Sequence, residues 1–296
     1  MAWVNTVITS VQAIPRKFNI YFGADFQIGS ESTDKQVVRN WVRKVVADPN
    51  AMWGLLGDIE DDDRPTTRAI RRGAFSGRKE VIGADAKKHK LWIDREVLPV
   101  LLPLVKRPCV GVLGGHHWYD MGEQTSTQYI CNALTGEKDH KVPYLGQMSA
   151  WVRMIFRMES RKHSLEKLFH IQHGVGGGGT LASALNRLEK TAQGFHGDVY
   201  VRAHDCKLVS GKYDIIAPER TPDGCPPKLK HRTVALMNIG SATRGYEMTL
   251  NDPNYAEMGM MRPQTLGWGV VHVQLYKQSR SIDIAQNFSA DVTIEI

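Results

Sequence analysis

The sequence predicts an α/β fold built on short, buried strands. Short apolar runs recur along the chain, and each stops at a polar residue that can bind a metal or move a proton. Helical spacing of apolar residues follows some of these runs, and this alternation is typical of parallel sheets. With 296 residues, 42% of them hydrophobic, the chain can bury a sizeable core without disulfides or a structural metal.

The first predicted strand covers residues 18–23 and stops at Ala24-Asp25. Its side chains are mostly apolar, as expected of a strand that is buried on both faces. The next segment, 34–46, is predicted to form an amphipathic helix, because its apolar residues recur at helical spacing. These residues are Val37, Val38, Trp41 and Val45.

Four more strands are predicted from short apolar runs of the same kind. They cover residues 52–56, 109–113, 168–172 and 199–202. The polar residues after them are Asp58, the pair His116-His117, His173 and His204. Ligands of open α/β folds bind where the carboxyl ends of the strands meet. We therefore expect these side chains to gather with Asp25 at one edge of the sheet.

Residues 61–106 are predicted to form a basic insert whose later part is helical. The segment opens with three aspartates, Asp61 to Asp63, and Trp92, Val97 and Leu101 indicate the helix. Its positive charges indicate a solvated helix face for the most part, or a cap that faces phosphate. They are Arg64, Arg68, Arg71, Arg72, Arg78, Lys79, Lys87, Lys88, Lys90 and Arg95.

The C-terminal third is predicted to be β-rich and to complete a second sheet. Residues 234–239 and 267–276 are strand-like, and 281–285 alternate in polarity. The stretch 218–227 is a loop by composition.

A run of glycines at 175–180, with the sequence VGGGGT, precedes a predicted helix at 181–190. It indicates either a turn that needs positive φ, which is favoured, or a loop whose N–H groups approach an anion. It is not a nucleotide-binding P-loop, because no Gly-Lys-Ser/Thr follows.

Composition excludes several classes of protein. The four cysteines form no Cys-x-x-Cys pair, which argues against a zinc ribbon or a secreted disulfide framework. The N-terminus lacks the order of a signal peptide, and the apolar run 97–104 is too short to span a membrane. We expect a cytoplasmic protein that does not bind membranes. The net charge of +7 is compatible with a polyanionic partner, but it is equally compatible with a protein that has no such partner.

The ordered set of strand-end residues resembles the calcineurin-like metallophosphoesterases. That family's pattern runs Asp-x-His, Gly-Asp, Gly-Asn-His, a lone His, and Gly-His-x-His. The matching segments are Asp25-Phe26-Gln27, Gly57-Asp58-Ile59-Glu60-Asp61, Gly114-Gly115-His116-His117, His173-Gly174 and Ala203-His204-Asp205-Cys206. Residues 143–146, 240–246 and 255–257 are similar to phage-encoded members.

The resemblance implies a single domain over residues 1–296 with a four-layer α/β/β/α sandwich of two mixed β-sheets flanked by helices. It also implies a phosphoesterase that holds one or two divalent ions, Mn, Zn, Fe or Ni. In such enzymes a metal-bound hydroxide attacks a phosphomonoester or phosphodiester. The basic insert points to a nucleotide or nucleic acid substrate, and a phage-encoded protein would act in the host cytoplasm.

By position, Asp58 corresponds to the aspartate shared by two metals, Asp25 to a ligand of the first metal, and His173 and His204 to ligands of the second. Two alignments of His116 and His117 with the family pattern are possible. If Gly114 is the family glycine, His116 is the catalytic acid. If Gly115 is that glycine, His116 is a ligand and His117 the acid, and this register is favoured because it preserves both functions.

Two residues depart from the family pattern, because Gln27 and Cys206 stand where members have metal-binding histidines. A Gln oxygen ligates weakly. Cys206 is either a thiolate ligand, which suits zinc, or a small buried residue that binds nothing. We therefore expect one metal to bind tightly and the other loosely or not at all. The departures also support an alternative function, in which a non-hydrolytic member keeps one metal and binds nucleic acid or protein.

Overall fold

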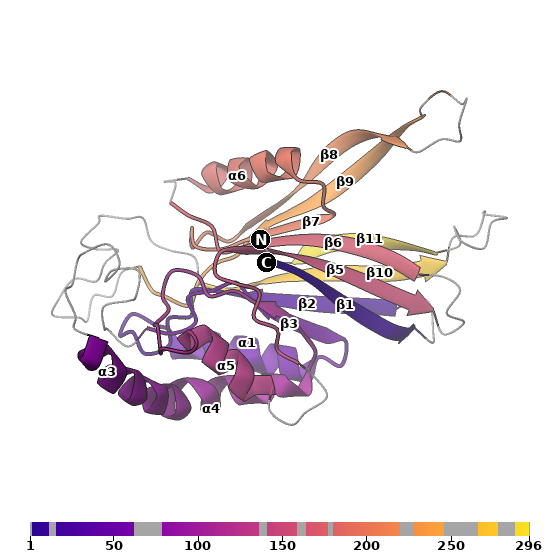
Figure 1. Cartoon of the computed structure of the whole chain (residues 1–296). Coiled ribbons are helices and arrows are strands. Elements are labelled where there is room, and N and C mark those ends of the chain that lie inside the picture. The colour runs from indigo at the N-terminus through magenta and orange to yellow at the C-terminus, as the bar shows by residue number, and fades with distance from the viewer. Residues whose placement is uncertain are drawn as a thin grey trace.

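A computed structural model shows two mixed β-sheets that face each other, with helices on both outer sides. Helix α6 covers the outer face of one sheet, and α1, α4 and α5 lie beside the other (Figure 1). This arrangement confirms the predicted α/β fold class. The structure describes residues 2–11, 16–61, 79–135, 141–158, 164–176, 180–219, 226, 228–245, 266–277 and 288–295.

The larger sheet has the strand order β1-β5-β6-β7-β9-β8. Strands β6, β7 and β9 are parallel, whereas β5 and β8 run antiparallel to their neighbours β6 and β9. Its strands are β1 (Ala2–Val11), β5 (Ser149–Met158), β6 (Ser164–Gln172), β7 (Val199–Arg202), β8 (Val209–Glu219) and β9 (Lys228–Asn238).

The smaller sheet has the strand order β11-β10-β2-β3-β4. Strands β2, β3 and β4 are parallel, and β10 is antiparallel to both of its neighbours. Its strands are β2 (Arg16–Gly23), β3 (Ala51–Leu55), β4 (Cys109–Val112), β10 (Gly269–Lys277) and β11 (Phe288–Glu295).

Side chains cap the N-termini of two helices. Asp34 caps α1, and its carboxylate accepts hydrogen bonds from the amides of Gln36 and Val37. Thr180 caps α6 in the same way through the Ser183 amide. The helical segments are α1 (Lys35–Ala47), α3 (Lys79–Trp92), the π-helical turn η1 (Ile93–Val97), α4 (Leu98–Leu101), the 3-10 turn η2 (Leu102–Lys106), α5 (Ser126–Thr135) and α6 (Leu181–Gly194).

Three apolar clusters hold these layers together. The side chains of successive strand residues point to opposite faces, so each buried strand contributes to two clusters. Val199 and Val201 of β7 pack between the sheets, whereas Tyr200 packs under α6 with Leu188. Trp53 of β3 packs against α1 on the other side. Burial on both faces explains why these strands are short and almost wholly apolar.

The C-terminal third is β-rich, as predicted, but it contributes strands to both sheets and not to one alone. Strands β8 and β9 join the sheet of β6 and β7, while β10 and β11 join the sheet of β2, β3 and β4. The sequence predicts none of β1, β5, β8, β11 and α5. The described residues of β8 are exposed or partly buried, so this strand lacks a continuous apolar run. Residues 281–285 lie outside the described part, as do most of 218–227 and the arginines Arg64 to Arg78.

Within the described residues, none of the helices combines the length and apolar character needed to cross a bilayer.

Candidate metal centre

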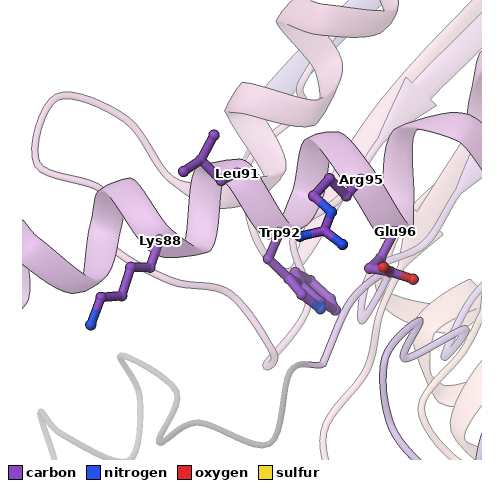
Figure 2. A pocket seen from close by; sticks show the side chains of 5 residues that line it. All are labelled: Lys88, Leu91, Trp92, Arg95 and Glu96. Atoms are coloured by element: carbon purple, nitrogen blue, oxygen red, sulfur yellow. The ribbon is translucent and has the colours of Figure 1, made fainter.

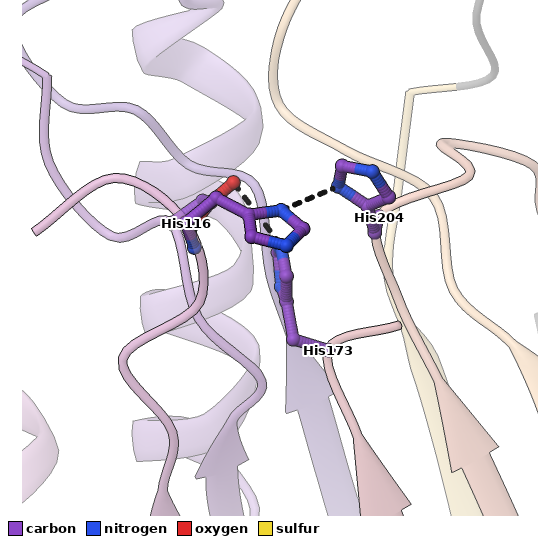
Figure 3. A group of neighbouring side chains, drawn as sticks. His116, His173 and His204 are labelled. Carbon is purple, nitrogen blue, oxygen red and sulfur yellow. Dashed lines mark hydrogen bonds and ion pairs between the residues drawn. The ribbon is translucent and has the colours of Figure 1, made fainter. Parts of the chain in front are cut away.

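Four predicted site residues meet between the two sheets. Asp58 follows β3, His116 follows β4, His173 follows β6 and His204 follows β7, and their ligand atoms all lie within 4.8 Å of one another. Figure 3 shows the three imidazole rings close together. Asp58, His116 and His173 are buried, and His204 is partly buried.

The sequence analysis predicts that these strand ends lie at one edge of a single sheet, and this is wrong. Asp25, Asp58 and His116 extend from the parallel strands β2, β3 and β4 of the smaller sheet. His173 and His204 extend from the parallel strands β6 and β7 of the larger sheet. Because the two sheets pack face to face, the site lies between the carboxyl ends of the parallel strands of one sheet and those of the other.

The carboxylate of Asp58 accepts two backbone hydrogen bonds on one oxygen. The amides of His116 and His117 donate to Oδ1 at 2.5 and 2.8 Å. Its other oxygen, Oδ2, lies 3.1 Å from His173 Nε2. Burial raises the pKa of Asp58, but the neighbouring His173 charge and hydrogen bond outweigh it, so the pKa lies below its ordinary value. Asp58 is therefore ionised at neutral pH.

His173 is oriented by the backbone. Its Nδ1 donates to the Leu56 carbonyl oxygen at 2.7 Å, which points Nε2 at Asp58. Burial lowers the pKa of His173, yet the charge of Asp58 raises it to about 9. The short gap between Nε2 and a carboxylate oxygen thus requires positive charge, which a proton or a metal ion can supply.

The other two rings are close enough to share an ion. The Nδ1 atoms of His116 and His204 are 3.3 Å apart. Burial, followed by the charge of His173, lowers the pKa of His204 to about 4, so this ring is neutral and offers a lone pair. One carboxylate and three imidazoles suit divalent ions such as Zn²⁺, Mn²⁺, Fe²⁺ or Ni²⁺. The residues present therefore fit a divalent metal ion.

Backbone strain marks this region. The non-glycine residues with positive φ in the described chain are Asp25 (49°), Gln27 (43°), Asp58 (51°), His204 (75°) and Cys206 (49°). Each such residue costs on the order of 1–3 kcal/mol and persists where the surroundings force it, which happens mainly at functional sites. All five are residues that the sequence reading assigned to a metal.

Gly115 is required by the close approach of Asp58. Its φ is +76°, and a Cβ at this position would lie 2.2 Å from Asp58 Oδ1. A side chain at position 115 would therefore displace the carboxylate, so this position cannot carry a ligand.

Asp25, which corresponds by position to a ligand of the first metal in the family pattern, lies beside the cluster. It is buried, and its Oδ2 accepts a hydrogen bond from the His204 amide at 3.1 Å. Burial raises its pKa to about 7, with the negative charge of Asp58 adding to the effect and the charge of His173 opposing it.

Gln27 and Cys206 have other partners. Gln27 Oε1 accepts a hydrogen bond from the Thr243 hydroxyl at 3.2 Å. Cys206 Sγ is 3.5 Å from the His204 carbonyl oxygen. Burial, together with the charge of Asp25, raises the pKa of Cys206 well above its ordinary value, so the sulfur is a neutral thiol. Cys206 is not among the four residues of the cluster.

His117 lies at the edge of the site and pairs with Asp61. Its Nδ1 is 3.0 Å from Asp61 Oδ2, and the ring is about one-third exposed at 32%. Burial lowers the pKa of His117, but the hydrogen bond to Asp61 and the charge of Asp58 outweigh it and raise the pKa. A partly exposed imidazole with a raised pKa can donate a proton to a bound group.

The sequence reading missed the part played by Asp61. It treated Asp61 as the start of an acidic run, although its place three residues after Asp58 was visible. It also missed a buried pair in the insert, where His89 Nε2 lies 3.1 Å from Glu60 Oε2. This contact places α3 against the loop that carries Asp58 and Asp61, and His89 also stacks on Trp92 of the same helix.

A separate shallow hollow of about 330 Å³ lies on the insert (Figure 2). It is lined by Lys88, Leu91, Trp92, Arg95 and Glu96, all on α3 and η1. It shares no residue with the metal cluster.

No protein-family profile matches the chain, and no curated protein matches it in sequence. Similar solved structures include Vps29 from Entamoeba histolytica complexed with zinc, at 9% identity and a TM-score of 0.32 over 94% of this chain and 99% of that one. Vps29 from Chaetomium thermophilum gives 12% identity and 0.34 over 94% and 97%. A protein of Streptococcus pneumoniae described as a predicted phosphoesterase gives 10% identity and 0.32 over 94% and 99%. Likeness at this level assigns no function.

Proposed function

We propose that the chain is a calcineurin-like metallophosphoesterase of the phage type, which hydrolyses phosphate esters in the cytoplasm with the help of divalent ions. The observation that carries this proposal is the cluster of Asp58, His116, His173 and His204 with the His117–Asp61 pair beside it. A site that only stabilises the fold has no need of a further, partly exposed histidine next to its ligands.

In this proposal, Asp58, His116, His173 and His204 hold the tightly bound ion. Asp25 and Asp58 face the weaker position, with Gln27 and Cys206 as its substituted ligands. A bound divalent ion lowers the pKa of water and neutralises charge on a phosphoryl group. The chain itself orients the ligands, since backbone groups fix both Asp58 and His173.

His117 is proposed as the general acid. Asp61 holds its Nδ1, which leaves Nε2 to donate a proton to the leaving oxygen. This choice corresponds to the register with Gly115 as the family glycine. Two observations favour it: His116 lies in the cluster, and position 115 has no room for a side chain.

The proposed substrate is a phosphomonoester or phosphodiester, with a nucleotide or nucleic acid favoured by the basic insert. Lys87, Lys88 and Lys90 are exposed on α3, and this helix packs on the loop of Asp61 through the His89–Glu60 pair. Exposed cations on this helix would attract a polyanion.

A specific observation favours the second candidate, a non-hydrolytic metal-binding protein. Cys206 is a neutral thiol outside the cluster, and Gln27 is engaged by Thr243. If only one ion binds, the second charge that stabilises the phosphoryl oxygens is missing.

Hydrolysis of bis-p-nitrophenyl phosphate and p-nitrophenyl phosphate, each with Mn²⁺, Mg²⁺, Zn²⁺ and Ni²⁺ in turn, tests the proposal. We expect metal-dependent release of p-nitrophenol from at least one of the two esters, abolished by a chelator. Metal binding without hydrolysis of either ester would favour the non-hydrolytic candidate.

A further inference from the structure

Asp205 is a buried carboxylate between two arginines, and no part of the proposed chemistry uses it. It lies between His204 and Cys206, with a side chain that is 0% exposed. It accepts a hydrogen bond from Arg202 Nε at 3.3 Å and from Arg187 Nη1 at 3.0 Å. A buried carboxylate is costly unless such partners compensate its lost hydration.

The same two arginines also hold the loop after His173. Arg202 Nη2 donates to the Val175 carbonyl oxygen at 3.1 Å, and Arg187 Nη1 donates to the carbonyl oxygen of Gly176. Gly174 makes room for this contact, since a Cβ there would lie 2.8 Å from Arg202 Cζ. Asp205 therefore links the loop of His204 to the loop of His173 through two guanidinium groups.

This link lies just beyond the ends of the two strands that carry the histidines. Strands β6 and β7 end at Gln172 and Arg202, one residue before His173 and two before His204. The ring centroids of His173 and His204 are 5.0 Å apart. His204 also has a φ of 75°, a conformation that its surroundings must impose.

We propose that Asp205 is a positioning residue of the metal centre, which sets the spacing of His173 and His204 by aligning Arg187 and Arg202 across the two loops. The inference rests on the part of the proposed function in which these histidines bind a divalent ion. It does not require that the protein hydrolyse an ester.

Asp198 provides a control at the opposite end of β7. It precedes β7, whereas Asp205 follows it, and it likewise accepts hydrogen bonds from an arginine, Arg232 Nη2 at 2.9 Å, and from the Leu168 amide at 2.7 Å. Its side chain is 20% exposed. Asp198→Asn therefore removes an arginine-paired carboxylate at the start of β7, away from His173 and His204.

Co²⁺ is the probe, because its visible absorption reports ligand geometry as well as binding. Titration of the full chain is expected to show an affinity about 10- to 100-fold weaker in Asp205→Asn, with an altered absorption band, since the loss of residues that orient ligands has effects of this size. Asp198→Asn is expected to match wild type in both affinity and band, even if it lowers thermal stability.

Equal Co²⁺ affinity and an identical band in folded Asp205→Asn and wild type would overturn the inference, as would a wild-type chain that binds no Co²⁺. If circular dichroism shows that Asp205→Asn does not fold, Arg187→Ala decides the question. It must weaken Co²⁺ binding, and Arg187→Lys must restore part of the affinity. Absence of ester hydrolysis by wild type that binds Co²⁺ would overturn only the proposed enzyme activity.

Discussion

The two sides of the metal centre differ in how completely the chain furnishes them. On one side, Asp58, His116, His173 and His204 gather from both sheets, with ligand atoms within 4.8 Å of one another. On the other side, Asp25 is accompanied by Gln27, which is engaged by Thr243, and by Cys206, whose thiol is neutral. Both sides carry the same strained backbone, with positive φ at Asp25, Gln27 and Cys206 as well as at Asp58 and His204.

The difference separates backbone geometry from ligand chemistry. The turns after β2 and β7 present Gln27 and Cys206 in left-handed conformations, a form of backbone strain that is typical of functional sites. Their side chains are nevertheless poorer ligands, because a Gln amide oxygen is neutral and a cysteine sulfur is unsuited to harder ions such as Mn²⁺. We therefore expect unequal metal affinity at the two positions, and four measurements test this expectation.

The largest effect is expected from Asp58→Asn. Asp58 faces both proposed metal positions, and its negative charge raises the pKa of His173. Replacing its carboxylate by a neutral amide should therefore weaken the binding of every metal ion in the site. Activity and metal content should fall by more than about 100-fold, because even residues that merely orient ligands cost about 10- to 100-fold. Near wild-type metal content by elemental analysis would show that the cluster does not bind metal.

His117→Ala should lower turnover by about 100- to 10,000-fold while the tight ion stays bound, as loss of a general acid does. His116→Ala should instead release the ion. His231→Ala is the control, because His231 forms a similar pair with Asp214 on the surface at 3.8 Å. Steady-state kinetics and metal analysis on the three variants decide the register. Loss of metal in His117→Ala alone would reverse it.

Cys206 and His204 lie two residues apart in the sequence but belong to different sides of the site. His204→Ala should release the tight ion, whereas Cys206→Ala should leave its affinity unchanged, since the thiol lies outside the cluster. Cys206→His should raise Mn²⁺-dependent activity by supplying a ligand that suits harder ions. Activity against metal concentration measures both effects. Identical Mn²⁺ and Zn²⁺ curves for wild type and Cys206→His would mean that residue 206 does not ligate.

The smallest effect concerns a histidine that lacks a carboxylate neighbour. His170 of β6 is buried among Trp151, Phe195 and Tyr200, and burial lowers its pKa to about 4, whereas the pKa of His173 is about 9. The unfolded chain binds the proton more readily, with a pKa near 6.5, so stability is lost as pH falls from about 6.5 toward 4.

In His170→Phe, the loss of unfolding free energy between pH 7 and pH 5 should be smaller than in wild type by about 1–2 kcal/mol. Urea unfolding at both pH values measures it, and His231→Ala, at an exposed site, should behave as wild type does. An unchanged pH dependence in His170→Phe would mean that the buried ring titrates normally.

Much of the fold and of the site was predictable because the signals are local. Strands β3, β4 and β7 are buried along their whole length, and the last residues of β2 and β6 are largely buried, so their apolar runs stand out in the sequence. The polar residues that follow these runs are therefore visible in the sequence as candidate metal ligands. The described residues of β8 are exposed or partly buried and form no such run, so the sequence does not predict this strand.

The amino-acid sequence shows which polar residues follow the strands and which kinds of ligand they offer. It does not show that Asp58 and His116 come from one sheet and His173 and His204 from the other, which is visible only in the folded chain. The same holds for the pairing of Asp61 with His117, and for the contacts of Asp205 with two arginines. The physical reason is that periodicity and turn chemistry act within a few residues along the chain. The distance between side chains on different strands depends on sheet register and on how two sheets pack.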